Sequence, residues 1–197
     1  AHYAPRAGRR ERHIGIAVPG PVTRGGVVLS APPLWGTAAR VMPLKALVEK
    51  HLGIHCLVVN DVTAAAARYA NLAQFRSHRL ICVVTVSSGV GNKVFDTRTM
   101  EPLLDSKGIS GEIGHVSTNL PPGAGVCDCG ERGHVSAIAS GRGAARFARY
   151  WANRQSNDFR RSIIAGWTNQ QARRITAEHL AAAAKRGDRF ALSVLDY

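Results

Sequence analysis

A short apolar run that ends abruptly at two polar residues is the feature that most constrains the fold of this chain. Residues 54–59, IHCLVV, have the composition of a buried strand, and Asn60 and Asp61 follow directly. The small residues of 62–73, VTAAAARYANLA, are typical of a closely packed helix, and the next apolar run, RLICVVTV, occupies 79–86. Strands that alternate with helices in this way predict an α/β fold.

Further elements are predicted on both sides of this segment. HIGIAVPGPV at 13–22 and GGVVLS at 25–30 are separated by a Pro-Gly-Pro break and predict a hairpin. Apolar spacing predicts a helix over 42–53, with Gly53 as its C-terminal stop. A turn is predicted at 87–92 and a short strand at 93–96. Three helices are predicted after them, at 136–154, 176–187 and 188–197.

The expected organisation is a basic lead-in at 1–13, a smaller α/β domain at 14–77, and a larger domain at 78–197 that contains the polar loop at 111–134 and the helices after it. The polar stretch QFRSHR at 74–79 is the predicted junction. The lead-in carries arginines without a following apolar core, so it does not resemble a secretory signal.

The charge of the chain favours anionic ligands but not nucleic acid. It has 26 basic and 13 acidic residues, a formal net charge of +13. The basic residues are scattered, and no nucleic-acid motif with interleaved aromatic residues is present. No apolar run approaches the ~20 residues needed to span a bilayer, so no membrane partner is expected.

The cysteines indicate a reducing, cytoplasmic setting. Cys56 and Cys82 lie within apolar strand-like runs and are predicted to be inert core residues. Cys127 and Cys129 are too close together for a useful disulfide and suit metal ligation instead.

Asn60 and Asp61 occupy a position where α/β folds place functional groups, at the end of a strand. An Asp held there can act as general base toward a substrate hydroxyl. The alternative is that the pair only caps the following helix, because Asn and Asp are favoured at that position.

The turn SSGVGN at 87–92 is a second candidate. Gly89 and Gly91 allow close approach of the backbone to a ligand, so that N–H groups can face phosphate oxygens. Short glycine turns are also common in hairpins that bind nothing.

The loop at 111–134 concentrates metal-binding side chains. Two imidazoles and two thiols are the usual donors for tetrahedral zinc, and they are supplied by His115, Cys127, Cys129 and His134. Glu112, three residues before His115, is placed to face a substrate. The alternative is a polar loop with spare thiols, since Cys-x-Cys is shorter than the common zinc-finger spacing.

Five segments, in order, closely resemble the ROK family, which groups sugar kinases with related repressors: GIAVPGPV, VVNDVTAAA, VTVSSGVGN, GISGEIGH and CDCGERGHVSAIASG. The resemblance implies an actin-like ATPase (ribonuclease H-like) α/β fold with the active site between two domains. It also implies ATP-dependent phosphorylation of a sugar or sugar-like hydroxyl, with Mg²⁺ accompanying ATP, and self-association into a homo-oligomer.

The resemblance also implies roles for individual residues. Asp61 matches the catalytic base, and Asn60, Asp61, Glu112 and His115 match contacts to the substrate. Ser88, Gly89 and Gly91 match the nucleotide phosphate-binding turn. His115, Cys127 and Cys129 match structural zinc ligands, and His134 stands where the family usually has a third cysteine.

Departures from the family pattern bear on activity and substrate. Ser136 replaces a glutamate that normally holds a hydroxyl near the anomeric end of the sugar, which suits a C7-cyclitol without an ordinary anomeric hydroxyl. The family's Asp-x-Gly-Gly-Thr motif is not found in 1–12, and the C-terminal adenosine segment is also missing. An incomplete two-domain kinase is therefore expected. The alternatives are a catalytically impaired fragment and a sugar-sensing domain that binds without phosphorylating.

Overall fold

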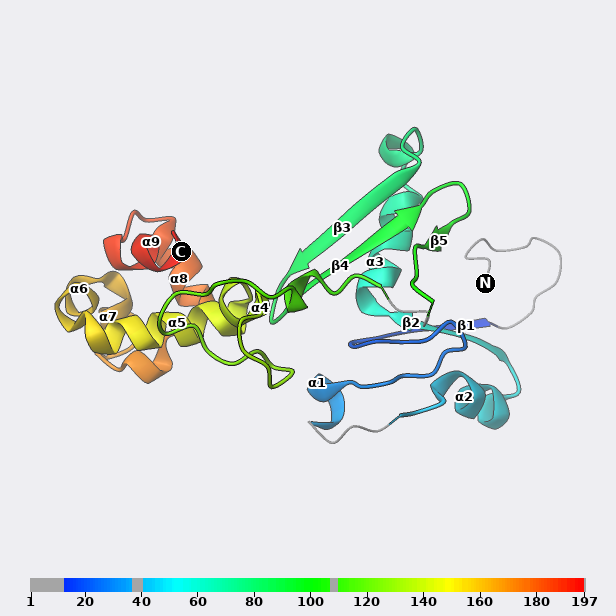
Figure 1. Cartoon of the computed structure of the whole chain (residues 1–197), viewed down its shortest axis with the longest axis horizontal. Helices are drawn as coiled ribbons and strands as arrows, with labels where there is room; N and C mark the ends of the chain where they lie inside the picture. The colour runs from blue at the N-terminus through cyan, green and yellow to red at the C-terminus, as the bar shows by residue number, and fades with distance from the viewer. Residues whose placement is uncertain (1–12, 37–40, 107–109, 197) are drawn as a thin grey trace. The chain divides into compact units, whose positions relative to one another are not determined.

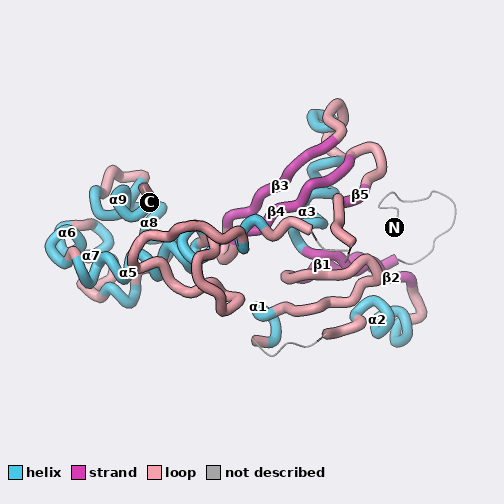
Figure 2. The backbone as a smooth tube through the Cα atoms, viewed as in Figure 1, coloured by secondary structure: helices cyan, strands magenta, loops and turns pink. Residues whose placement is uncertain are grey.

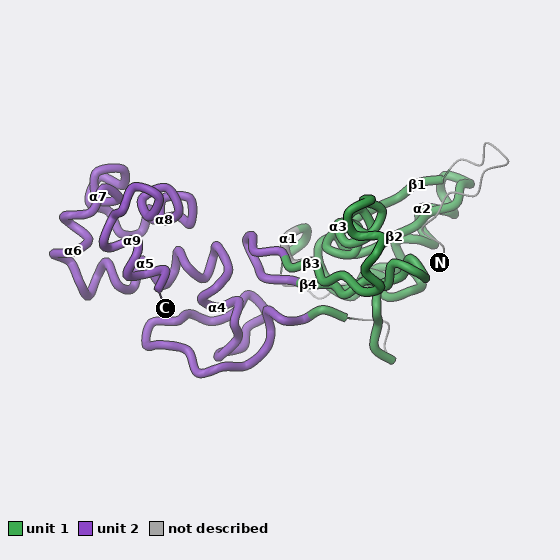
Figure 3. Tube along the Cα trace, turned by 90° about the horizontal axis from the view of Figure 1, so that it is seen from above, with its two compact units in different colours: residues 1–84, 92–111 green, residues 85–91, 112–197 purple. Residues whose placement is uncertain are grey.

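The computed structural model describes residues 13–36, 41–106 and 110–196. The residues form two compact units, one from 1–84 with 92–111 and one from 85–91 with 112–197 (Figure 3). Most of the predicted lead-in therefore lies outside the described residues. The junction predicted at 74–79 falls inside the first unit.

The first unit contains a parallel pair of strands. β1 (His13–Val18) pairs in parallel with β2 (His55–Asn60), with Ile16 opposite Val58. The predicted hairpin forms only in part: 25–30 is not a regular strand, but Val28 makes an antiparallel bridge with Val22, and Leu29 N donates to Pro21 O at 2.9 Å. Prolines at 19 and 21 cannot donate the hydrogen bonds that a continued strand needs.

Helix α2 (Leu44–Leu52) packs beside this pair and ends as predicted, with Gly53 left-handed at φ 64°. Glu49 joins the helix to the strand: its carboxylate accepts from Lys45 Nζ at 2.6 Å and from the Cys56 backbone N–H at 3.0 Å. The buried core here consists of Val18, Val28, Ala31, Cys56 and Val58. A short helix, α1 (Pro32–Trp35), precedes α2.

The rest of the first unit is built on helix α3 (Asp61–Ala70), which follows β2 directly. Its Ala66 and Ala70 are buried with Phe95 of β4 (Val90–Asp96). A second sheet has the order β3–β4–β5, where β3 is Leu80–Val86 and β5 is Glu101–Pro102. A 3₁₀ turn, η1 (Ala73–Phe75), follows α3.

Cys82 was predicted to be buried, and that prediction is wrong. β3 alternates exposed and half-buried residues, and Cys82 is on the exposed side with Leu80, Val84 and Val86. An apolar run predicts a strand, but it does not show whether one face or both faces are covered. Cys56, by contrast, is buried as predicted.

The second unit is helical around one central helix, α5 (Gly141–Arg154), as Figures 1 and 2 show. Phe147 of α5 lies in a core with Ile164, Leu180 and Phe190. The other helices of this unit are α4 (Ser136–Ala139), α6 (Ser156–Arg161), α7 (Ile163–Trp167), η3 (Ala172–Arg174), α8 (Ala177–Ala184) and α9 (Arg189–Leu195). In the described part of the chain, no helix has the length and apolar character needed to cross a membrane.

Capping side chains determine where these helices start. The predicted single helix over 136–154 is wrong, because Ser140 is extended and its hydroxyl caps α5 by accepting from Gly143 N at 3.0 Å. Asp188 starts the last helix as predicted, accepting from Ala191 N at 2.9 Å. The same carboxylate accepts from Ile163 N at 2.8 Å, and so also holds the start of α7.

The turn after β4 generates a prediction about acid stability. Asp96 is buried, and its pKa is lowered chiefly because the Arg98 backbone N–H donates to it at 2.8 Å. Since the folded-state pKa is the lower one, the carboxylate stabilises the first unit above the unfolded pKa, and this contribution is lost as the pH falls through the folded value. Asp96→Asn should therefore lose less stability between about pH 5 and pH 2 than the parent chain.

Urea unfolding followed by circular dichroism at several pH values measures this difference. Asp158→Asn, at an exposed carboxylate of α6, is the control and should follow the parent. Equal loss of stability in Asp96→Asn and the parent on acidification would contradict the lowered pKa of Asp96.

Candidate functional site

Asn60 both caps α3 and orients Asp61. Its Oδ1 accepts from Val62 N at 3.0 Å and Thr63 N at 3.2 Å. Its Nδ2 donates to Gly20 O at 3.0 Å and to Asp61 Oδ1 at 2.9 Å. Asp61 is exposed in the first turn of the helix, where the helix dipole favours a negative charge. Of the two residues considered for the cap, Asn60 takes that position, and the carboxylate of Asp61 stays accessible to solvent.

A cavity beside Asn60 is too small to be a substrate site by itself. Its volume is about 50 Å³, and Val58, Asn60, Thr63 and Glu101 are among its lining residues. Pockets for small-molecule ligands are typically about 300–1,000 Å³. A sugar ring therefore does not fit in it.

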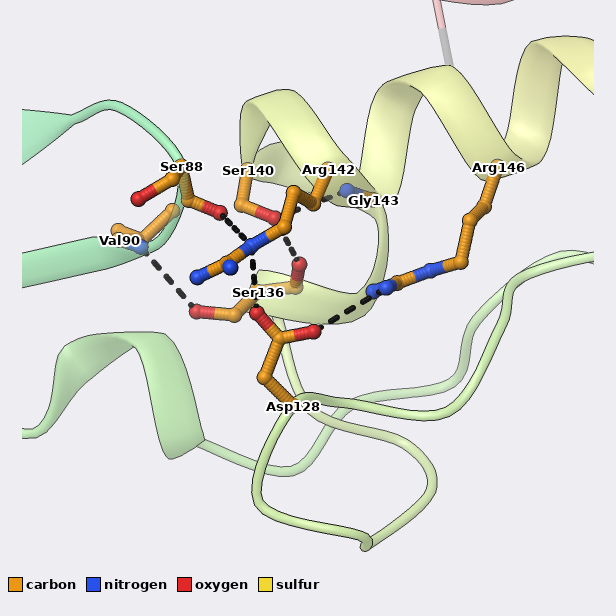
Figure 4. A network of polar contacts seen from close by, with 8 residues as sticks. All are labelled: Ser88, Val90, Asp128, Ser136, Ser140, Arg142, Gly143 and Arg146. Atoms are coloured by element: carbon orange, nitrogen blue, oxygen red, sulfur yellow. Dashed lines mark hydrogen bonds and ion pairs between the residues drawn. The ribbon is translucent and has the colours of Figure 1, made fainter. Parts of the chain in front are cut away.

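The turn at 87–91 is held by contacts to the helices of the second unit (Figure 4). Gly141 N donates to Ser87 O at 2.7 Å, and Val90 N donates to Ser136 Oγ at 3.4 Å. Neither Gly89 nor Gly91 has a positive φ, and a Cβ at Gly89 would meet open space. The open space leaves this side of the turn accessible.

A groove of about 870 Å³ lies beside this turn within the second unit. Ser87 and Ser88 line it together with three arginines of α5, namely Arg142, Arg146 and Arg149. Guanidinium groups suit phosphate oxygens. The groove is not purely cationic, because Glu178 also lines it, and a hydrogen bond with the Thr176 side chain lowers the Glu178 pKa.

The four predicted metal ligands converge. One donor atom from each of His115, Cys127, Cys129 and His134 lies within 4.8 Å of the others. Cys129 Sγ is 3.3 Å from His134 Nδ1, and the rings of His115 and His134 stack with centroids 5.1 Å apart. Two thiols and two imidazoles in such a cluster fit a tetrahedral zinc ion. Among the described residues this is the one group of at least three potential ligands.

Backbone contacts bring these distant residues together. His115 ends the 3₁₀ turn η2 (Ile113–His115), and Ser117 forms an antiparallel bridge with His134. Around the cysteines, Gly130 N donates to Cys127 O at 2.9 Å, with Gly130 left-handed at φ 99°. Burial raises the pKa of the Cys127 thiol, and a bound cation opposes this effect because ligating thiols are deprotonated.

Glu112 lies against His115 rather than apart from it. One carboxylate oxygen is 3.5 Å from His115 Nδ1, and the Glu112 side chain is about half exposed. Carboxylates in this position commonly orient metal-binding imidazoles. The exposed part of the carboxylate remains available to a ligand.

Ser136 has a packing role that the sequence did not reveal. It is buried, accepts from Val90 N, and lies close to Gly114. A Cβ at Gly114 would come within 2.3 Å of Ser136 Oγ and 2.2 Å of Val90 O, so only glycine fits there.

Sequence reasoning also missed the side chains that connect the metal loop to α5. Asp128 forms ion pairs with Arg142 and Arg146. A sequence signal was present, because two arginines one turn apart in a predicted helix favour an acidic partner. It did not identify which carboxylate that partner is.

Comparison with known proteins places these features in a family. The family model described as "ROK family" matches residues 2–197. The C(7)-cyclitol 7-kinase of Streptomyces hygroscopicus subsp. limoneus is 44% identical over 178 residues, covering 90% of this chain and 49% of that protein. The 2-epi-5-epi-valiolone 7-kinase of an Actinoplanes species is 38% identical over 134 residues, covering 66% and 37%.

A solved structure gives the same result. The crystal structure of a ROK family glucokinase from Streptomyces griseus, in complex with glucose and AMPPNP, matches with a TM-score of 0.66 and 26% identity. It covers 91% of this chain and 55% of that one. The chain spans about half the length of the curated cyclitol 7-kinase it matches. The chain has the mixed α/β fold of these kinases and belongs to the ROK family.

Proposed function

We propose that this protein transfers the γ-phosphoryl group of ATP to a hydroxyl of a cyclitol or sugar, with Asp61 as general base. The observation that carries the proposal is the accessible carboxylate of Asp61 at the end of β2, oriented by Asn60. Asp61 accepts the proton of the substrate hydroxyl while the oxygen of that hydroxyl forms a bond to the γ-phosphorus. The bond from that phosphorus to the ADP oxygen breaks, and the negative charge leaves with ADP.

The nucleotide end of the reaction is assigned to the turn at 87–91 and the groove beside it. Ser88, Gly89 and Gly91 face the phosphates in this proposal, with Mg²⁺ arriving as the ATP complex. The open space at Gly89 and the arginines of the groove support the assignment. Phosphoryl transfer depends mainly on positioning and charge neutralisation, which such groups supply.

The substrate end is assigned to Asn60, Asp61, Glu112 and His115. A C7-cyclitol is the favoured substrate class. The two relatives reported above are a C(7)-cyclitol 7-kinase and a 2-epi-5-epi-valiolone 7-kinase. Ser136 also stands where the family resemblance leads us to expect a glutamate beside an anomeric hydroxyl. Cytoplasmic location and homo-oligomerisation stay predictions.

The cluster of His115, Cys127, Cys129 and His134 is assigned to structural zinc. The ion would cross-link a segment that has little regular secondary structure of its own. The convergence of the four donors supports this assignment.

Replacing the base tests the reaction directly. Asp61→Asn should reduce transfer of labelled phosphate from ATP by about 10²–10⁴-fold, because the amide cannot accept the proton. Substrate binding, measured by calorimetry, should weaken far less than transfer, because the amide still offers a hydrogen-bonding oxygen in place of the carboxylate. Asp158→Asn is the matched control, since it removes a carboxylate from the first turn of another helix.

The acceptor panel contains a valiolone-type cyclitol, glucose and N-acetylmannosamine. Efficient phosphorylation of glucose or N-acetylmannosamine without the cyclitol would exclude the favoured substrate class. Binding of the cyclitol without any transfer by the parent chain would instead support a sensing role. An active Asp61→Asn variant would remove Asp61 as base.

Metal analysis tests the zinc assignment. We expect about one zinc per chain by mass spectrometry of the purified protein, since four donors complete a tetrahedral site. Cys129→Ser and His134→Ala should lose zinc and melt at lower temperature. Cys82→Ser, which changes an exposed cysteine of β3, should keep its zinc and the melting temperature of the parent. A parent chain substantially below one zinc would contradict the ligand set.

A further inference from the structure

Asp128 lies between the two cysteines of the metal cluster and reaches two arginines (Figure 4). Its Oδ2 is 2.8 Å from Arg142 Nε, and its Oδ1 is 3.1 Å from Arg146 Nη1. The arginines are one turn apart on α5 and repel each other at that spacing. One carboxylate shared between them offsets that repulsion.

Arg142 extends this contact to the phosphate turn. The Nε–H of Arg142 donates to Ser88 O at 3.2 Å, while Asp128 holds the same guanidinium by an ion pair. A continuous chain of contacts therefore runs from the cysteine pair through Asp128 and Arg142 to the backbone of the turn. All of these residues belong to the second unit.

The contacts are half-exposed, and this determines what they can do. The exposed fractions of the side chains are 40% for Asp128, 49% for Arg142 and 34% for Arg146. Exposed ion pairs contribute little when both partners must be ordered. Here both neighbours of Asp128 are predicted metal ligands, so metal binding fixes the backbone that carries the carboxylate.

We propose that Asp128 is a positioning residue that couples occupancy of the metal cluster to the order of the phosphate turn through Arg142. When the cluster holds zinc, Asp128 keeps the Arg142 guanidinium against Ser88. When the metal is removed, the carboxylate moves with its loop and the turn loses this support. The consequence for nucleotide binding rests on the function proposed above. The coupling is reciprocal, so a ligand bound at the turn should tighten zinc binding by the same factor.

Hydrogen exchange measures the coupling without reference to activity. In the parent chain, zinc loading should slow amide exchange in a peptide spanning 86–92 by about tenfold relative to the chelated protein. Asp128→Asn should reduce this effect to less than about threefold. Glu131→Gln, which removes an exposed carboxylate from the same loop, is the matched control and should respond like the parent.

A second variant covers the case in which Asp128→Asn disturbs zinc binding itself. Arg142→Lys lies outside the metal loop and keeps the positive charge but removes the planar Nε–H donor. It should bind zinc normally and still lose the zinc-dependent protection of 86–92. Unchanged protection in Arg142→Lys, or equal loss in Glu131→Gln, would overturn the proposal.

Affinity for AMP-PNP then connects the coupling to the proposed function. The zinc-loaded parent should bind AMP-PNP about fivefold more tightly than the chelated parent, and Arg142→Lys should not show this difference. If the parent binds no AMP-PNP, the kinase proposal fails at its nucleotide end, and the exchange experiment still decides the role of Asp128. If AMP-PNP binds equally with and without zinc in the parent, the coupling is rejected.

Discussion

The segment between η2 and α4 has to hold a defined shape with almost no regular secondary structure. It forms neither helix nor strand between Val116 and Val135, apart from the bridge between Ser117 and His134. Backbone hydrogen bonds join its two ends, as from Thr118 N to Gly133 O at 2.8 Å, and the four metal-binding side chains converge there with donor atoms within 4.8 Å of one another. Asp128, between the two cysteines, contacts α5, and Glu112 contacts His115, so both carboxylates adjoin this cluster.

Elements with strong local signals could be predicted from the sequence, and elements determined by tertiary contacts could not. Gly53 and Asp188 mark helix ends by their own backbone and side-chain chemistry, and both were predicted. The hairpin prediction was right only for the short return between Val22 and Val28, because β1 itself pairs with β2, which lies far along the chain. The exposure of Cys82 could not be predicted from the apolar run either, since such a run does not show which face of the strand is covered.

The candidate site divides in the same way. The metal ligands could be predicted from the sequence because two thiols and two imidazoles are a recognised donor set for zinc. That the four side chains converge is a property of the fold. Helix capping was one of the two roles predicted for Asn60 and Asp61. The structure shows that Asn60 caps α3 and also donates a hydrogen bond to Asp61. The link from Asp128 to Arg142 was missed because it joins a loop to a helix, and no local periodicity reports such a pair.

The packing around Ser136 limits the order in which mutations can change this protein. Ser136 Oγ accepts from Val90 N, and Gly114 leaves no room for a Cβ beside it. A longer carboxylate at 136 needs space that the turn and η2 now occupy, and it removes the hydroxyl that holds Val90. Replacing Ser136 with glutamate therefore requires that the neighbouring backbone shift first.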